Sequence, residues 1–231
     1  MTIWNHLPGD RLLIDLSLWS ARLHALGEDI QRIDTYPDLY HLDVSDDHFV
    51  PGLLFFPDLV AALRPLTAHP FHVHLMADHP EGLVEPFLAA GADLITVHIE
   101  NGTLGRAAIE LIRRAGKSAG IALSLEVEPE EAIPYLEIVD LVLMMGTPLG
   151  IKGQGLAPQA IQRIRTMRQL IDSHGYSGRV KIFADGGIRQ HTVAGLRAAG
   201  ADGIVPGSLV FGSARVSETI QWLHSLSTQV T

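Results

Sequence analysis

The chain has 231 residues, of which 47% are hydrophobic and 19% charged, and its 17 Lys and Arg against 26 Asp and Glu give a formal net charge of -9. This composition predicts a soluble globular protein rather than a disordered one. An acidic excess of this kind lacks the basic field that nucleic-acid binding needs, so we expect no DNA or RNA partner. The length and even composition favour one domain over residues 1–231.

No cysteine is present, which excludes disulfides, thiolate zinc ligands and thiol catalysis and fits a reducing compartment. Any metal ion must therefore be held by nitrogen and oxygen atoms. Residues Met1 to Asp10 carry no basic segment followed by an apolar run, and no stretch approaches the roughly 18 apolar residues of a membrane span. We therefore expect a cytoplasmic protein without membrane contact.

Short apolar, β-branched runs recur along the chain and predict eight strands. They are Leu12–Leu16, Tyr40–Val44, Phe71–Met76, Leu94–Val97, Ile121–Leu125, Leu141–Met145, Val180–Phe183 and Gly203–Val205. Most are separated by segments of helical spacing, such as the one that carries Ile161, Ile164, Met167, Leu170 and Ile171. Strands that alternate with helices form a parallel sheet, and eight such units in this length match a closed (β/α)8 TIM barrel. An open doubly wound sheet is the alternative.

Small residues and glycine mark the predicted turns from helix to strand. The sequence Ala-Ala-Gly-Ala-Asp occurs at 89–93 and again at 198–202, before the fourth and eighth strands. Two interpretations stay open: the copies reflect an internal βα repeat, or each copy independently forms a helix C-cap.

Polar side chains interrupt the second predicted strand, where apolar ones are expected. His41 and Asp43 alternate with Leu42 and Val44, so both polar side chains face the barrel interior. Two inward polar groups are costly unless they are paired or bind a cation.

The third strand repeats this pattern with His72 and His74 on one face, and the seventh ends at Asp185. Each residue alone is more simply a hydrogen-bonded core or rim residue. Convergence at the carboxyl ends of three strands instead predicts a site for one divalent metal ion, with the ligands His41, Asp43, His74 and Asp185. Mixed imidazole and carboxylate ligands suit Zn, Fe(II), Mn or Co without choosing among them.

Glycine-rich segments follow the last two strands, where barrels commonly bind phosphate. These are Asp185-Gly186-Gly187 and Pro206-Gly207-Ser208. The loop 146–154 after the sixth strand has three glycines before Gln154 together with Lys152, and it is interpreted as a mobile lid, as a second anion contact or as a plain surface loop.

With these residues identified, the chain resembles the ribulose-phosphate 3-epimerase family over nearly its whole length. The motifs that carry the resemblance are Ile14-Asp15-Leu16-Ser17-Leu18, His41-Leu42-Asp43-Val44, Asp46, His48-Phe49-Val50-Pro51, Val73-His74-Leu75-Met76, Leu94-Ile95-Thr96-Val97-His98, Leu141-Val142-Leu143-Met144-Met145, Asp185-Gly186-Gly187 and Gly207-Ser208.

The resemblance implies an isomerase, a carbohydrate epimerase of the pentose phosphate type that inverts C3 of a ketose phosphate through an enediolate. It implies that Asp43 and Asp185 are the two acid/base residues as well as metal ligands, in agreement with the interpretation from the strands. The implied substrate-binding residues are Ser17, His74, Met76, Met145, Gly153, Gly186, Gly187, Gly207 and Ser208. Among these, the methionines would shield the enediolate from water, and Gly187, Gly207 and Ser208 would contact phosphate.

Four departures from the family pattern bear on the substrate. Ser45 stands where the family usually has Met, Asp47 where it has Gly and His72 where it commonly has Asp. The family's Asn-Pro-Gly-Phe-Gly-Gly-Gln lid becomes Pro148–Gln154. The changed lid and wall suggest an alternative to the ribulose 5-phosphate type, namely a different ketose phosphate such as allulose 6-phosphate or a tetrulose phosphate.

Two further alternatives stay open. Decarboxylases of related fold use an Asp-x-Lys-x-x-Asp array, but the segment from Asp43 to Asp46 lacks that lysine. A non-catalytic sugar-phosphate-binding barrel is the other, and retention of all four metal ligands argues against it. We expect a small phosphorylated ketose as the partner and a homo-oligomer, either a dimer or a hexamer.

Overall fold

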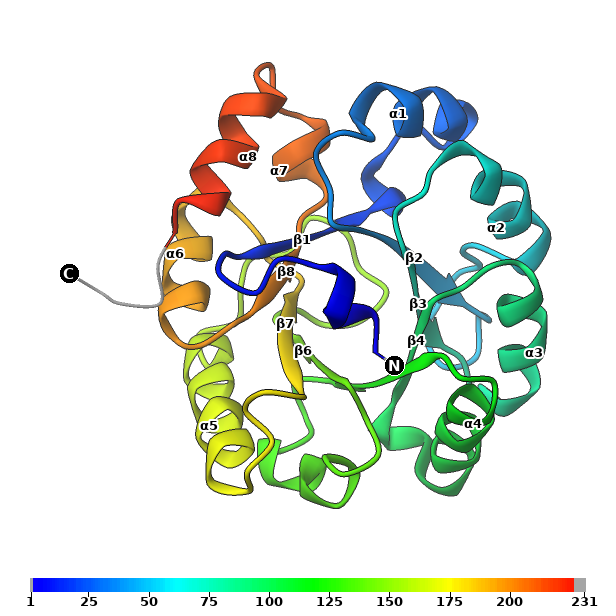
Figure 1. Cartoon of the computed structure of the whole chain (residues 1–231), viewed down its shortest axis with the longest axis vertical. Coiled ribbons are helices and arrows are strands. Elements are labelled where there is room, and N and C mark those ends of the chain that lie inside the picture. Colours follow the sequence, from blue (N-terminus) through cyan, green and yellow to red (C-terminus); the bar gives the residue numbers. More distant parts are fainter. Residues whose placement is uncertain (1, 227–231) are drawn as a thin grey trace.

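The computed structural model describes residues 2–226, and its core is a closed barrel of eight parallel strands (Figure 1). The strands are β1 (Leu13–Ser17), β2 (Leu39–Ser45), β3 (Phe71–Met76), β4 (Leu94–His98), β5 (Ser118–Leu123), β6 (Leu141–Met145), β7 (Lys181–Asp185) and β8 (Gly203–Val205). Each strand pairs with the next, and β8 pairs with β1 to close the ring. The predicted TIM barrel is therefore confirmed, and the open doubly wound sheet is wrong.

Helices surround the barrel and cover the outer face of the strands (Figure 1). They are α1 (Leu26–Ile33), α2 (Pro57–Leu63), α3 (Glu81–Ala89), α4 (Gly102–Arg114), α5 (Ala160–Ser173), α6 (Gln190–Ala198), α7 (Ser208–Phe211) and α8 (Val216–His224). Short 3-10 segments complete the described chain, namely η1 (Ile3–His6), η2 (Leu18–Ser20), η3 (Leu23–Ala25), η4 (Arg64–Leu66), η5 (Ile99–Asn101) and η6 (Pro129–Tyr135). Between β5 and β6 the connection is η6, where Pro134, inside the segment, disfavours a regular α-helix.

The fifth strand differs from its predicted range, Ile121–Leu125. It begins three residues earlier, at Ser118, and ends at Leu123. The added residues are small. At one of them, Gly120, which lies opposite Thr96 on β4, a Cβ would meet the Thr96 hydroxyl at 2.3 Å. Contact with a neighbouring strand therefore requires glycine at position 120, and an apolar pattern does not reveal it.

The two copies of Ala-Ala-Gly-Ala-Asp form equivalent turns. Gly91 and Gly200 have φ values of 99° and 113°, which favour glycine. Asp93 accepts a hydrogen bond from the Phe71 N–H of β3 and pairs with Arg64. Asp202 accepts one from the Ile182 N–H of β7 and pairs with Arg168. The repeat therefore serves the same structural role twice.

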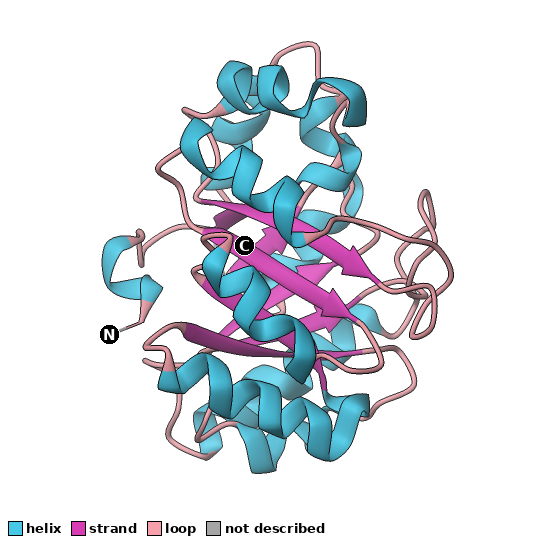
Figure 2. Ribbon diagram, turned by 90° about the vertical axis from the view of Figure 1, so that its right-hand side faces the viewer, coloured by secondary structure: helices cyan, strands magenta, loops and turns pink. Residues whose placement is uncertain are grey.

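The two ends of the barrel differ. At the amino ends of the strands, η1 lies across the opening and Trp4 packs against Phe183 with ring centroids 5.6 Å apart (Figure 1). The strand arrowheads point toward the longer loops at the other end (Figure 2). No helix within residues 2–226 combines the length and the hydropathy needed to cross a membrane.

Candidate active site

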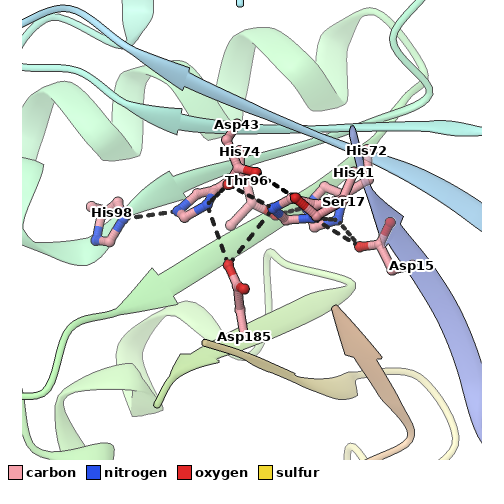
Figure 3. Close-up of polar contacts among 9 residues, drawn as sticks. All are labelled: Asp15, Ser17, His41, Asp43, His72, His74, Thr96, His98 and Asp185. Atoms are coloured by element: carbon pink, nitrogen blue, oxygen red, sulfur yellow. Dashed lines mark hydrogen bonds and ion pairs between the residues drawn. The ribbon is translucent and has the colours of Figure 1, made fainter. Parts of the chain in front are cut away.

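Four side chains from three strands meet inside the barrel near its carboxyl end (Figure 3). The Asp43 carboxylate lies 3.2 Å from His41 Nε2 and 3.5 Å from His74 Nδ1. From β7, Asp185 lies 3.7 Å from the same atom of His41 and 3.8 Å from that of His74. One potential ligand atom from each residue lies within 4.8 Å of all the others. The alternation of side chains on β2 and β3 thus brings together the four residues predicted as metal ligands.

The chemistry of the cluster fits a divalent cation. His41 Nε2 and His74 Nδ1 are buried, and neither has a hydrogen-bond partner among residues 2–226. An unpaired buried nitrogen is costly, and two such atoms beside two carboxylates form a set of donors that a cation satisfies. Histidine nitrogen and carboxylate oxygen together suit Zn and the neighbouring transition metals.

The two carboxyl groups lie in electrostatically different surroundings. Burial alone would raise the pKa of Asp43, but His41 and His74 outweigh it and hold the pKa well below its usual range. Burial raises the pKa of Asp185, and the charge of Asp43 adds to that rise. For His74, burial lowers the pKa to about 3, which keeps the imidazole neutral and able to act as a ligand. Carboxyl groups with pKa values pushed apart are typical of acid/base pairs.

A cavity of about 350 Å³ opens above this cluster. All of the predicted substrate-binding residues line it, namely Ser17, His74, Met76, Met145, Gly153, Gly186, Gly187, Gly207 and Ser208. Asp43 and Asp185 also line it, whereas His41 lies behind the wall. The reactive end of the cavity is therefore bounded by two carboxylates and two methionines.

Two glycines shape the opposite part of the cavity through close contacts. A Cβ at Gly207 would lie 2.1 Å from Ser20 Oγ, and one at Gly187 would lie 2.6 Å from the backbone of Leu156. Gly187 also has a φ of 68°, in the left-handed region. Only glycine fits these positions without a shift, so packing against Ser20 and Leu156 accounts for both glycines.

The lid loop is held by a lysine to η2, the short segment that follows β1. Lys152 Nζ donates a hydrogen bond of 2.5 Å to the Trp19 carbonyl oxygen and lies 4.7 Å from the centre of the Trp19 ring. Trp19 precedes Ser20, which packs against Gly207. The Lys152 ammonium group is therefore near the glycine-lined part of the cavity.

Three of the four departures from the family pattern lie outside the cavity. The Ser45 hydroxyl donates to the Gly52 carbonyl oxygen at 2.7 Å, and Asp47 accepts the Gly52 N–H at 2.6 Å. Asp47 also takes a left-handed φ of 64°, a conformation that favours glycine and tolerates Asp, and it does not line the cavity. His72 is fully buried below the site. Only the lid changes the lining.

A hydrogen-bonded layer lies behind the four predicted ligands, and two of its members, Asp15 and Thr96, were not predicted as part of the site. Asp15 contacts both His41 and His72, and His72 contacts Thr96 (Figure 3). His98 Nε2 lies 2.9 Å from His74 Nε2. The available signal was alternation, since Asp15 shares a face with Ser17, as Thr96 does with His98.

This arrangement defines a TIM-barrel enzyme with a buried site of two histidines and two aspartates at the carboxyl ends of its strands. A family model described as "Ribulose-phosphate 3 epimerase family" matches residues 13–211, so the chain belongs to this family. The ribulose-phosphate 3-epimerase of Synechocystis sp. is 37% identical over 217 residues, which cover 90% of this chain and 91% of the relative. The Escherichia coli K12 enzyme of the same name is 34% identical, with 92% and 95% covered. The chain is thus an isomerase-class carbohydrate epimerase.

Solved structures of lower sequence identity share the fold. A 3-keto-L-gulonate-6-phosphate decarboxylase from Vibrio cholerae superimposes with a TM-score of 0.69 at 15% identity and covers 92% of this chain and 95% of its own. A 3-hexulose-6-phosphate synthase gives a TM-score of 0.63 at 17% identity, with 94% and 99% covered. At these identities the likeness supports the barrel architecture alone.

Proposed function

We propose that this chain is a metal-dependent 3-epimerase that interconverts ketose phosphates of the ribulose 5-phosphate and xylulose 5-phosphate type. Family membership and the names of the relatives support the epimerase activity. The observation that carries the chemistry is the meeting of Asp43 and Asp185, from two non-adjacent strands, beside two unpaired histidine nitrogens. We further propose that residues 1–231 act as one barrel domain.

His41, Asp43, His74 and Asp185 would hold one divalent cation, chosen from Zn, Fe(II), Mn and Co. When bound, the cation would supply a Lewis acid next to the carbonyl at C2 and the hydroxyl at C3 of the substrate. The proton at C3 is too weakly acidic for a carboxylate unless the developing oxygen charge is stabilised, so the site needs such an electrophile.

Asp43 and Asp185 would move the proton. One carboxylate removes it from C3 to form the enediolate, and the other returns a proton to the opposite face, which inverts the carbon. Ser17 donates to Asp43 Oδ2 and would keep that carboxylate aimed at the substrate. Met76 and Met145 line the cavity at this level and would exclude water from the enediolate.

The phosphate group would bind at the glycine-lined part of the cavity. Gly186, Gly187, Gly207 and Ser208 line this part, and their backbone N–H groups would bind the phosphate oxygens. Lys152 and Gly153 of the lid would close over the substrate, and the lysine would add a positive charge near the phosphate.

A different ketose phosphate, such as allulose 6-phosphate or a tetrulose phosphate, is the second candidate, because the lid departs from the family pattern and lines the cavity. A non-catalytic sugar-phosphate binder is disfavoured by the retention of all four metal ligands. The resemblance also leads us to propose a homo-oligomer, and sedimentation velocity would distinguish a monomer from a dimer or hexamer.

A substrate screen with metal analysis of the same sample tests the proposal. Purified protein of known metal content is incubated with ribulose 5-phosphate, allulose 6-phosphate and a tetrulose phosphate, and the C3 epimers are quantified. We expect the highest kcat/KM with the pentulose phosphate. A higher value with another ketose phosphate would favour the second candidate, and no turnover with any of them would overturn the epimerase proposal.

A further inference from the structure

His41 is held on both sides of its ring. Its Nε2 atom faces the proposed metal site, and its Nδ1 atom lies 3.0 Å from Asp15 Oδ2. The same oxygen lies 2.5 Å from His72 Nδ1, and His72 Nε2 lies 2.7 Å from Thr96 Oγ1 (Figure 3). Asp15, His72 and Thr96 are fully buried, so solvent does not compete for these contacts.

The contacts define where the protons lie. An ionised carboxylate only accepts hydrogen bonds, so His41 and His72 both donate from Nδ1 to Asp15 Oδ2. The Nε2 atom of His72 then accepts a hydrogen bond from the Thr96 hydroxyl. The 3.2 Å approach of the two Nδ1 atoms follows from two donors sharing one acceptor. With its proton on Nδ1, His41 presents an unprotonated Nε2 to the metal site.

Asp15, His41 and His72 also form a group that could in principle hold a second metal ion. The distances argue against it. Two ligands of a tetrahedral cation with bonds of about 2.0–2.1 Å lie roughly 3.3 Å apart, whereas Asp15 Oδ2 and His72 Nδ1 are 2.5 Å apart. This distance fits a charge-assisted hydrogen bond.

The buried carboxylate of Asp15 lowers the stability of the fold. Its Oδ1 atom is buried without a hydrogen-bond partner among residues 2–226. A buried carboxylate with an unpaired oxygen is unfavourable, and an apolar side chain would satisfy the barrel interior better. Its presence is explained by what it does for His41.

We propose that Asp15 is a positioning residue that fixes the tautomer and ring orientation of His41, and that His72 and Thr96 hold Asp15 in place. This inference rests on the proposed function, because it assigns Asp15 to the same metal centre. β1 and β3 flank β2, so positions 15 and 72 can both reach His41. In this chain the carboxylate stands on β1, and His72 occupies the position where the family resemblance leads us to expect Asp.

Metal affinity is the direct test. The dissociation constants of Zn²⁺ and Co²⁺ are measured by chelator competition for the wild type, Asp15→Asn and Asp15→Leu. Loss of the carboxylate behind a histidine ligand weakens metal binding by about 10- to 100-fold, and we expect that loss together with a changed Co²⁺ absorption spectrum. Asp38→Asn is the matched control, since Asp38 is also buried but pairs with Arg11 at the other end of the barrel. Affinities within twofold of the wild type for both Asp15 variants would overturn the inference.

A relocation variant separates positioning from general stability. Asp15→Asn combined with His72→Asp moves the carboxylate from β1 to β3, opposite His41 in the strand register. We expect metal affinity to return to within about threefold of the wild type, and a double variant as weak as Asp15→Asn would count against the inference.

A tautomer measurement requires no variant. Nitrogen NMR of labelled histidine in the Zn²⁺-loaded wild type should show His41 protonated on Nδ1 with Nε2 bound to the metal, and a His41 protonated on Nε2 would overturn the inference. The outcomes also separate the two proposals. Wild-type protein that binds no divalent metal contradicts the proposed metal dependence, whereas tight wild-type binding that both Asp15 variants retain contradicts only the role of Asp15.

Discussion

The hydroxyl of Ser17 donates a hydrogen bond of 2.9 Å to Oδ2 of Asp43, across the neighbouring strands β1 and β2. The other oxygen of that carboxylate, Oδ1, faces His41 and His74. One oxygen is thus fixed by the fold while the other belongs to the proposed metal centre. This division explains how a single aspartate can serve both as a ligand and as a base.

Ser17→Ala should therefore lower kcat about tenfold with little change in KM. A hydrogen bond to a charged group is worth about 1.5–3 kcal/mol, and without it the Asp43 carboxylate is less well oriented. Steady-state kinetics measure the effect. Ser45→Ala is the control, because the Ser45 hydroxyl is also buried but bonds to Gly52 outside the cavity. Equal kinetic losses in both variants would contradict a specific role for Ser17.

Asp43→Asn and Asp185→Asn should each lower kcat by about 10²–10⁴, the usual contribution of a positioned acid or base. Circular dichroism should show that both variants remain folded. Asp47→Asn, which alters a carboxylate outside the cavity, should leave kcat unchanged. Variants that unfold while their folded fraction stays active would show that these aspartates are structural.

Removal of the metal should abolish turnover and lower the melting temperature. A cation that binds only the folded protein stabilises it by mass action, so dialysis against a chelator should remove both the activity and that stabilisation. Adding back Zn, Fe(II), Mn or Co one at a time should restore activity and melting temperature together. Full turnover by protein whose metal content is undetectable would contradict the proposed centre.

Lys152→Met should raise KM for the phosphorylated substrate about tenfold while kcat changes little, because the ammonium group lies near the proposed phosphate position. Lys152→Arg should recover part of the loss, since it keeps the charge. Lys181→Met, at the amino end of β7, is the control for net charge. If KM is unchanged, Lys152 serves only to hold the lid against Trp19.

Strand alternation was sufficient to predict the centre of this site. His41 and Asp43 interrupt an apolar strand with a period of two, and that pattern alone predicts two polar side chains facing inward. The barrel closes as predicted because parallel strands of this kind bury both faces. The start of the fifth strand was missed by three residues, and one of them, Gly120, faces the Thr96 side chain of another strand, where a Cβ would not fit.

The contacts around the site depend on tertiary register, which a single sequence does not reveal. Asp15 lies on an apolar strand, and its partners His41 and His72 are 26 and 57 residues away. The pairing of Lys152 with Trp19 spans 133 residues. The left-handed backbone of Asp47 could not be known in advance either.

Solvent exchange at C3 tests the central claim most directly. Metal-loaded protein is incubated with ribulose 5-phosphate in D₂O, and the substrate and product are analysed by proton NMR and mass spectrometry. Two-base transfer by Asp43 and Asp185 predicts one deuterium at C3 of the epimerised product, with epimerisation strongly reduced in either Asp→Asn variant. Absence of exchange across pentulose, hexulose and tetrulose phosphates would contradict the account.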